Sequence, residues 1–297
     1  MPELPDIELY RVRLEERIAG RAIRHVRTYN PFVLRTVSPA PAALEGARAE
    51  QVLRVGKRVA ITTDRGLSLV FHLMIAGRFD WRNKPLATRP NGKVIVASVE
   101  FESGTLTLQE AAKQKRASLH LLEGDPRALD PGGAEPYEIC AEAFRSLLAG
   151  DGRTVKRLLT DPRTLSGIGN AYSDEILHAA RLSPIQIASK LSDEEAERLH
   201  DRMVSVLRKW EAKLQEEFPG FPSPAQITAF RPDFAVHGRF GLPCPDCGHK
   251  VQRIVRGEHE TNYCAFCQTG GKILADRSLS RLLKDAWPRT LEEMEGG

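Results

Sequence analysis

The sequence lacks long apolar runs and segments of biased composition. No stretch approaches the roughly 18 consecutive apolar residues of a membrane-spanning helix, which excludes an integral helical membrane protein. The first residues also lack the basic, apolar and small-residue regions of an export signal, so we expect a cytoplasmic, reducing location. Internal repeats and low-complexity tracts are absent as well. A chain of 297 residues with this ordinary composition predicts two or three globular domains.

Positively charged residues are in slight excess over negatively charged ones. The formal net charge is +4. Such an excess suits a polyanionic partner, but many proteins that bind no polyanion share it. Composition alone therefore identifies no partner.

Cysteines are few, but four of the five lie close together. Cys140 stands apart from the segment CPDCGHKVQRIVRGEHETNYCAFC, which contains two CxxC pairs formed by Cys244, Cys247, Cys264 and Cys267. Sixteen residues separate the pairs, which is the spacing of a zinc ribbon. Two disulfides would need an oxidising location, and a redox site would need one pair rather than two. We predict one structural Zn²⁺ whose four thiolate ligands leave no open position for catalysis.

The N-terminal part predicts a domain of strands over residues 1–135. A helix opens the chain at 2–18, and β-branched runs follow at 58–75 and 93–108. Turn residues divide each run into two strands, which predicts hairpins folded into an antiparallel sandwich. Glycines and a proline then mark a boundary near Gly132.

The pattern becomes helical from about residue 136. Ser192 and Glu195 form a capping box before an apolar stripe that extends to Leu214, which predicts a long helix. A stretch with three prolines then connects to the cysteine-bearing segment, so we place domains at 136–225 and 226–297. The tail after the last cysteine also reads as helical, and its sequence indicates no role.

A glycine-rich loop, Ser166-Gly167-Ile168-Gly169-Asn170, separates two apolar segments. The glycines permit a tight turn, and Asn170 is expected to cap a new helix whose free N–H groups favour a phosphate. The alternative is an ordinary helix hairpin, since a lone GxG is weak evidence. The basic residues between the cysteine pairs are equally open to two interpretations, a phosphate contact or a solvated hairpin.

Several motifs together resemble the formamidopyrimidine-DNA glycosylase and endonuclease VIII family. They are PELPDIE at the N-terminus, GKR with Lys57, the GIGNAYSDE loop, and HGRFGLPCPDCG leading into the four-cysteine ribbon. The resemblance implies an α+β multidomain fold: an N-terminal helix with an antiparallel β-sandwich, a helix-two-turn-helix domain and a C-terminal zinc ribbon. It implies a base excision repair enzyme that binds double-stranded DNA containing oxidised bases or abasic sites. We expect a monomer.

The resemblance makes Pro2 the nucleophile once Met1 has been removed. The secondary amine of an N-terminal proline is partly neutral at pH 7 and can attack the sugar C1′, giving an iminium ion that permits β and then δ elimination. Glu3 resembles the family's acid/base carboxylate, with Asp6 and Glu8 in support. Helix formation alone also favours proline and acidic residues in a first turn, but it does not explain their position at residue two.

Other site residues come from the same resemblance. Lys57 resembles a hairpin lysine that grips the phosphate beside the lesion, although a lysine there would otherwise be an ordinary exposed residue. Asn170 and Lys156 resemble the phosphate contact of the helix-two-turn-helix domain. Glu175 matches a further position, which we expect to orient neighbouring groups.

The chain departs from the family pattern where a filler for the space left by a flipped base is expected. Met74 and Ile75 are the candidates, supplied by one loop as in the endonuclease VIII branch, because the later loop EAAKQKRAS carries no aromatic residue. Core packing beside the strand LVFHL is the alternative for both residues. The preference between oxidised purines and oxidised pyrimidines stays open.

A second departure lies in the ribbon. His259 occupies the position of the family's usual arginine, and its partial charge at pH 7 predicts a weaker and more pH-sensitive phosphate contact. Arg256 is a candidate substitute.

Two other functions compete with the enzyme. One is a non-catalytic relative that binds damaged DNA, and the other is a zinc-ribbon factor that acts on RNA. The presence of Pro2, Glu3 and Lys57 favours the enzyme.

Overall fold

The computed structural model describes residues 1–86, 93–257, 259–274 and 288–295. The chain forms two compact units. The sandwich unit comprises residues 1–132 and 209–229, and the ribbon unit comprises residues 133–208 and 230–297. Within the described ranges, no helix combines the length and the apolar character needed to cross a membrane.

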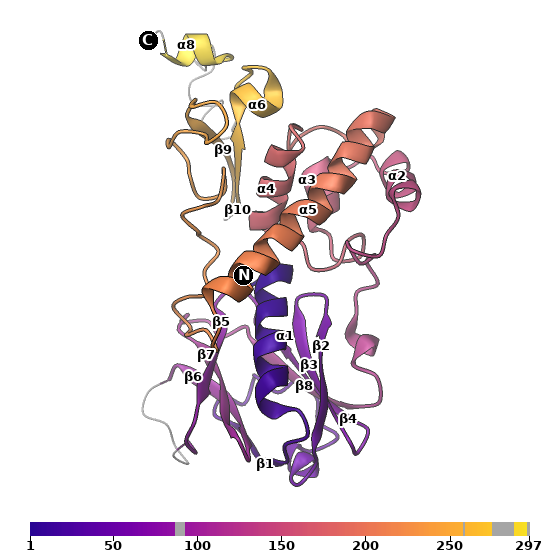
Figure 1. The fold of residues 1–297 in the computed structure, drawn as a ribbon, viewed down its shortest axis with the longest axis vertical. Helices are drawn as coiled ribbons and strands as arrows, with labels where there is room; N and C mark the ends of the chain where they lie inside the picture. Colours follow the sequence, from indigo (N-terminus) through magenta and orange to yellow (C-terminus); the bar gives the residue numbers. More distant parts are fainter. Residues whose placement is uncertain (87–92, 258, 275–287, 296–297) are drawn as a thin grey trace. The chain divides into compact units, whose positions relative to one another are not determined.

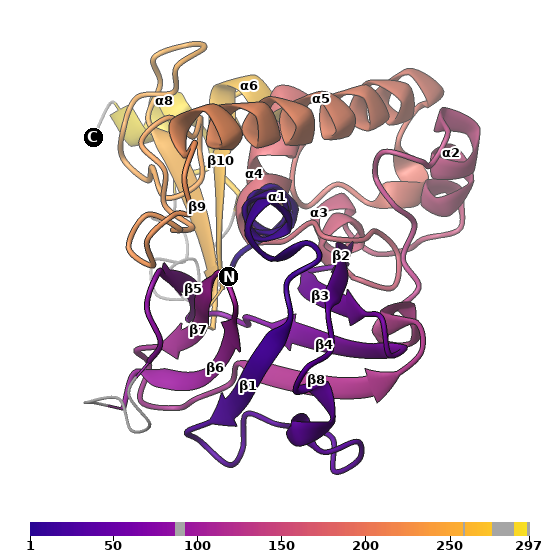
Figure 2. The same cartoon turned by 60° about the horizontal axis from the view of Figure 1, so that its bottom comes forward.

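The sandwich unit consists of two four-stranded antiparallel sheets and an N-terminal helix (Figures 1 and 2). The strand orders are β1-β6-β7-β5 and β2-β3-β4-β8. The strands are β1 (Ile23–Thr28), β2 (Ala49–Val55), β3 (Arg58–Thr63), β4 (Leu67–His72), β5 (Gly77–Arg82), β6 (Ile95–Phe101), β7 (Gly104–Glu110) and β8 (Ser118–Glu123). Short 3-10 helices lie at η1 (Pro41–Leu44) and η2 (Pro126–Leu129). The predicted antiparallel sandwich is confirmed, including the division of both β-branched runs into hairpins β3–β4 and β6–β7.

The N-terminal helix α1 (Leu4–Ile18) shares the core of the sandwich. Its buried residues Ile7 and Leu14 pack in one cluster with residues of both sheets, among them Val59 and Val99. Figure 2 shows α1 end-on beside β2 and β3. Burial of this large apolar cluster favours close packing of α1 against the sheets. The first turn of α1 therefore has a defined position.

The ribbon unit contains most of the helices and the cysteine-bearing hairpin. Its elements are α2 (Ala141–Ala149), α3 (Val155–Thr160), α4 (Asn170–Ala179), η3 (Ala188–Lys190), the first part of α5 (Asp193–Glu217), β9 (Val251–Arg256), β10 (His259–Cys264), α6 (Ala265–Thr269) and α8 (Leu291–Glu295). Strands β9 and β10 form an antiparallel hairpin. The zinc ribbon and the helical domain of the predicted fold are therefore present.

The long helix α5 begins at the predicted capping box. Ser192 Oγ accepts a hydrogen bond from the Glu195 N–H at 3.2 Å, and Glu195 Oε2 accepts from the Ser192 N–H at 3.0 Å. Leu199, Met203 and Leu207 form the buried stripe that follows. Both expectations for this helix are confirmed.

The start of α4 differs from the prediction by one residue. Gly169 is the N-cap, and Asn170 is the first helical residue rather than the cap. The reason is a distant partner, because Asn170 Nδ2 donates to the carbonyl of Glu260 in β10 at 2.8 Å. The side chain therefore joins the helix to the hairpin instead of closing the helix end.

The C-terminal tail returns to the ribbon. The Leu291 N–H donates to the Gly271 carbonyl at 2.9 Å, and Leu291 packs with Ile254 and Tyr263 of the hairpin. Most of the segment predicted to be helical, residues 275–287, lies outside the described residues, and the described tail helix is α8. The ribbon core thus includes residues well beyond the last cysteine.

The capping box at α5 gives a test of this fold. Ser192→Ala removes the hydroxyl acceptor for the Glu195 N–H and should lower the free energy of unfolding by about 1 kcal/mol. Ser205→Ala is the matched control, because Ser205 is exposed on the same helix and bonds to the Arg202 carbonyl at 3.3 Å. The control should stay within about 0.5 kcal/mol of the original chain. Chemical denaturation followed by circular dichroism measures both, and equal losses would contradict the capping role.

Candidate functional site

Two carboxylates lie buried at the head of α1. Glu3 and Asp6 are each 3% exposed, and Asp6 Oδ2 accepts a hydrogen bond from the Glu3 N–H at 2.9 Å. The helix dipole at this end stabilises negative charge. The helix start therefore holds Glu3 in a fixed place next to the first residues of the chain.

Several charged side chains affect the pKa of the N-terminal amine. This amine belongs to Met1 in the structure and would belong to Pro2 after removal of Met1. Burial lowers the pKa of the amine, Glu3 opposes the shift, and Arg78 and Lys57 add to it. A lowered pKa increases the neutral fraction of an amine at pH 7, and only the neutral form is a nucleophile.

Lys57 lies in the two-residue turn between β2 and β3. Gly56 precedes it with a φ of 61°, a left-handed conformation that favours glycine. Burial lowers the pKa of Lys57, and the charge of Glu3 opposes the shift. A desolvated ammonium is stabilised by an anion, so this site favours a phosphate or carboxylate partner. The fold thus places Lys57 where the negative charge of Glu3 acts on its ammonium.

The loop between β4 and β5 carries Met74 and Ile75. Met74 has a φ of 54°, and its N–H donates to His72 Nδ1 at 3.1 Å. Burial, together with the charge of Arg58, lowers the pKa of His72 to about 4, so its ring is neutral at pH 7 and can accept this bond. Ile75 is 56% exposed, which removes core packing as an explanation for Ile75. Met74 is partly buried.

Arg78 fixes the far end of this loop. Its guanidinium donates to the carbonyls of Ile75 at 3.1 Å and Gly77 at 2.7 Å, and to Ile227 at 2.5 Å. A Cβ at Gly77 would come within 2.2 Å of the Leu73 carbonyl oxygen, so the turn requires glycine there. The loop is therefore held at both ends.

Sequence reasoning missed His72 and Arg78. Both residues flank the candidate filler in the segment HLMIAGR. Their position beside Met74 and Ile75 was the sequence feature that could have indicated a role in holding this loop. Their partners are backbone groups of the loop and of Ile227, which residue types alone do not indicate.

The ribbon unit brings Lys156 and Asn170 together. Lys156 Nζ donates to the Asn170 carbonyl at 3.2 Å, Ser173 Oγ at 3.0 Å and Asp174 Oδ1 at 2.5 Å. Its side chain is only 12% exposed. These contacts tie α3 to the first turn of α4.

Two consecutive acids of α4 bind the segment that leads to the first cysteine pair. Asp174 Oδ2 lies 2.7 Å from His237 Nδ1 and accepts from the Asn262 N–H at 3.1 Å. Glu175 accepts from the N–H groups of residues 235–237 at 2.7, 2.9 and 2.9 Å. Burial raises the pKa of Glu175, and these three bonds oppose the shift. Glu175 thus orients neighbouring backbone.

The four cysteines of the ribbon form one cluster. Their Sγ atoms all lie within 4.8 Å of one another, with Cys247 and Cys264 at 3.4 Å and Cys244 and Cys267 at 4.0 Å. A disulfide needs about 2.05 Å. A tetrahedral zinc ion with Zn–S bonds of about 2.3 Å separates its sulfurs by about 3.8 Å. The observed spacing therefore fits one zinc ion and no disulfide.

Burial and the close packing of the thiols shift the pKa of three of these cysteines. Burial and neighbouring thiols raise the pKa of Cys264, and they raise that of Cys267 to about 12. Burial opposes ionisation of Cys247, but hydrogen bonds from His249 outweigh it and lower the pKa to about 7. Ionisation of all four thiols would need a compensating dication, which zinc would supply.

The ribbon hairpin presents Arg256 at its exposed end. Arg256 pairs in register with His259 across β9 and β10, and its side chain is exposed. The side chain of His259 lies outside the part that the structure describes. Arg253, by contrast, pairs with Glu260 at 3.2 Å.

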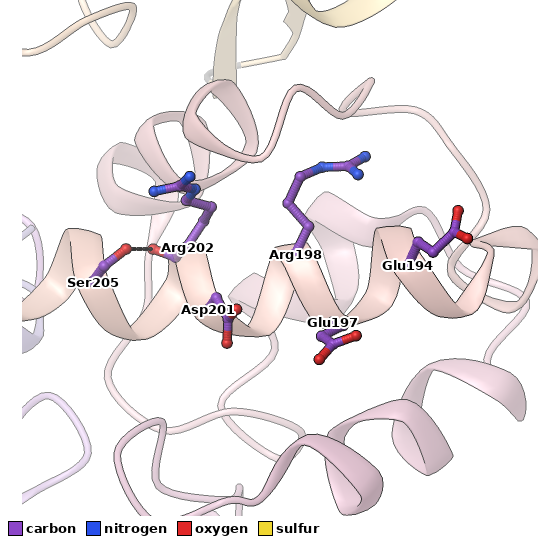
Figure 3. A pocket seen from close by; sticks show the side chains of 6 residues that line it. All are labelled: Glu194, Glu197, Arg198, Asp201, Arg202 and Ser205. Carbon is purple, nitrogen blue, oxygen red and sulfur yellow. Dashed lines mark hydrogen bonds between the residues drawn. The ribbon is translucent and has the colours of Figure 1, made fainter.

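A surface hollow of about 390 Å³ lies along α5 (Figure 3). It is lined by Glu194, Glu197, Arg198, Asp201, Arg202 and Ser205. All of these come from one helix, and Arg198 Nε already donates to the Ala180 carbonyl at 2.8 Å. Because the lining comes from this helix alone and carries charges of both signs, we assign the hollow no part in the site.

Three family models match the chain. They are the formamidopyrimidine-DNA glycosylase N-terminal domain over residues 1–121, the formamidopyrimidine-DNA glycosylase H2TH domain over residues 132–213, and the zinc finger found in FPG and IleRS over residues 241–270. The last range contains all four clustered cysteines.

Individual proteins agree with these matches. An uncharacterized formamidopyrimidine-DNA glycosylase-like protein of Mycobacterium tuberculosis is 42% identical over 159 residues, which is 54% of this chain and 96% of that protein. A formamidopyrimidine-DNA glycosylase of Thermus thermophilus is 34% identical over 282 residues, which is 91% of this chain and all of that protein (100%).

Solved structures of a Lactococcus lactis relative show the same fold. Its complex with DNA containing Fapy-dG superposes with a TM-score of 0.78 at 26% identity, covering 90% of this chain and 100% of that one. Its complex with abasic-site DNA gives a TM-score of 0.77 at 25% identity, covering 90% and 99%.

The cysteine cluster predicts a defined zinc content. Cys247→Ser should lower the zinc content from one ion per chain and destabilise the ribbon, and a strong chelator should have the same effect on the unaltered chain. Cys140→Ser is the matched control, because Cys140 is exposed and outside the cluster. Elemental analysis and thermal unfolding measure these effects. Full zinc content in Cys247→Ser would show that this thiol is not a ligand.

Proposed function

The chain belongs to the formamidopyrimidine-DNA glycosylase family, and on that basis we propose that it is a bifunctional enzyme of base excision repair. It removes oxidised bases from double-stranded DNA and then cleaves the strand at the abasic site. The observation that carries the proposal is the buried Glu3 carboxylate, whose backbone is held by Asp6 at the head of α1 directly beside residue 2. The four-thiolate zinc site has no open position, so the zinc holds the ribbon and the reaction belongs to the N-terminal residues.

In this proposal Pro2 forms the covalent intermediate. Its neutral amine bonds to C1′ of the deoxyribose while the bond from C1′ to the base breaks, and the base leaves with the electron pair and takes up a proton. Opening of the sugar ring converts the adduct to an iminium ion. Removal of a C2′ proton then expels the 3′ phosphate, and a second elimination expels the 5′ phosphate.

Glu3 moves the protons of these steps. As a carboxylic acid it can protonate the ring oxygen as the sugar opens, and as a carboxylate it can accept a proton from the reacting carbon. Asp6 positions it, since Asp6 Oδ2 binds the Glu3 N–H. Lys57 binds the phosphate beside the lesion, because a desolvated ammonium gains a counter-charge there.

The ribbon unit supplies backbone contacts to the duplex. We propose that the side-chain amide of Asn170, at the start of α4, donates to a phosphate of the duplex. One Nδ2 hydrogen of Asn170 reaches Glu260, and the amide carries a second. Lys156 supports this contact by holding the first turn of α4, and Arg256 with His259 adds a cationic contact from the hairpin.

Met74 and Ile75 fill the space vacated by the flipped nucleotide. Extrusion of a base costs a few kcal/mol of stacking, and an apolar side chain inserted into the stack offsets part of that cost. Exposure of Ile75 and the fixed conformation of its loop support this role.

Borohydride trapping tests the covalent step. Borohydride reduces an iminium to a stable amine, so the processed protein should form a covalent product with abasic DNA, linked through the nitrogen of Pro2. A short extension before Pro2 converts that nitrogen to an amide and should reduce trapping to background. The same extension added at the C-terminus is the matched control and should leave trapping unchanged.

Mass spectrometry decides the outcome. Attachment of DNA to another residue, or trapping by chains that still carry Met1, would rule out Pro2 as the nucleophile. Tight binding of abasic DNA without trapping by the processed protein would instead identify a non-catalytic damage-binding relative.

The filler is tested by Ile75→Ala. We expect about a tenfold loss of base excision from duplex DNA, equivalent to about 1.4 kcal/mol of lost transition-state stabilisation, with cleavage of single-stranded abasic DNA unchanged. Val37→Ala is the matched control, because Val37 is a β-branched residue of the same unit that is 99% exposed. A panel of oligonucleotides, each with one defined oxidised base, measures excision and lesion range together. Equal excision by both variants would remove Ile75 from this role.

A further inference from the structure

One face of α4 is buried against the ribbon through polar side chains. Asn170, Asp174 and His178 follow one another at intervals of four residues, so they lie along one stripe of the helix. Asn170 reaches the carbonyl of Glu260, and Asp174 reaches the Asn262 N–H. The stripe ends at the cysteine cluster.

His178 is the member of this stripe that reaches the metal site. It is 4% exposed, and its Nε2 lies 3.3 Å from Sγ of Cys244, which is itself 2% exposed. Sulfur bound to zinc carries negative charge and has no proton to donate, so the hydrogen in this contact must come from the imidazole. The arrangement is therefore an N–H···S hydrogen bond once zinc is bound.

We propose that His178 is a positioning residue of the zinc site, which donates from Nε2 to the Cys244 thiolate and joins the metal to α4. It acts from outside the coordination shell, since four thiolates complete a tetrahedron. The bond fixes the direction of the Cys244 side chain and withdraws charge from its sulfur. Both effects slow release of the ion and attack on the sulfur by electrophiles.

A second contact supports this connection between the metal site and α4. Gln268 Oε1 accepts from the N–H of the ligand Cys264 at 2.8 Å, and Gln268 Nε2 donates to the carbonyl of Leu182, just beyond α4, at 2.9 Å. Ligands from both cysteine pairs are therefore tied to the same helical segment.

Zinc affinity tests the proposal, and the readouts need neither DNA nor activity. His178→Phe keeps the volume and loses the donor, so we expect one zinc per chain with about tenfold weaker affinity in competition with a chromogenic chelator. Cys244 should also be alkylated faster in the presence of zinc. His178→Gln retains an N–H donor and should recover most of the affinity.

The matched control is His200→Phe in the same unit. His200 Nε2 contacts the Ile139 carbonyl at 2.8 Å and no cysteine, so this variant loses stability without a change in zinc affinity. Cobalt substitution gives a spectroscopic readout, because thiolate-to-cobalt charge-transfer bands should keep a four-sulfur pattern but shift in energy in His178→Phe.

Three results would overturn the proposal. They are unchanged zinc affinity in folded His178→Phe, an equal loss of affinity in His200→Phe, and a cobalt spectrum that loses or gains a sulfur ligand. The last would mean that His178 affects which groups coordinate the metal rather than supporting a ligand from outside.

Discussion

Burial of charge at the head of α1 is the constraint on which the N-terminal site depends. Glu3 is buried, and its negative charge favours the charged forms of both Lys57 and the N-terminal amine. That balance needs α1 to stay where it is. Tyr10 contributes directly, since its buried hydroxyl accepts the Phe79 N–H at 3.3 Å and its ring meets Phe79 edge-on, which joins α1 to the strand that carries Arg78. An apolar core thus determines the position of the polar groups.

The ribbon unit compensates its buried charge with a network of hydrogen bonds around α4. Asp174 is wholly buried as a side chain and is balanced by Lys156, His237 and a backbone N–H. Such a network is directional, so it specifies one arrangement of α4 and the hairpin in a way that apolar contact does not. The loss of any one member leaves a buried group without its partner, which is costly.

Local sequence patterns were sufficient to predict much of the fold and part of the candidate site. The hairpins β3–β4 and β6–β7 could be predicted because turn residues interrupt β-branched runs, and the zinc ligands because two CxxC turns specify a metal by spacing alone. Asn170 was misplaced by one residue because its partner, Glu260, lies 90 residues further along the chain. His178 stands as a single polar residue in an apolar run, and its role could not be predicted because its partner, Cys244, is also distant in the sequence. Side chains that bind a backbone atom or a sulfur far away in the sequence produce no periodic pattern from which the contact could be predicted.

The return of the C-terminal tail to the hairpin has a practical consequence for exchanging parts between relatives. The matched zinc-finger motif ends at residue 270, but Leu291 covers Ile254 and Tyr263 from beyond that limit. A finger transplanted at the motif boundary would expose these two side chains to water. Exposed apolar surface would lower the stability of the finger and favour aggregation. The portable module therefore extends through α8.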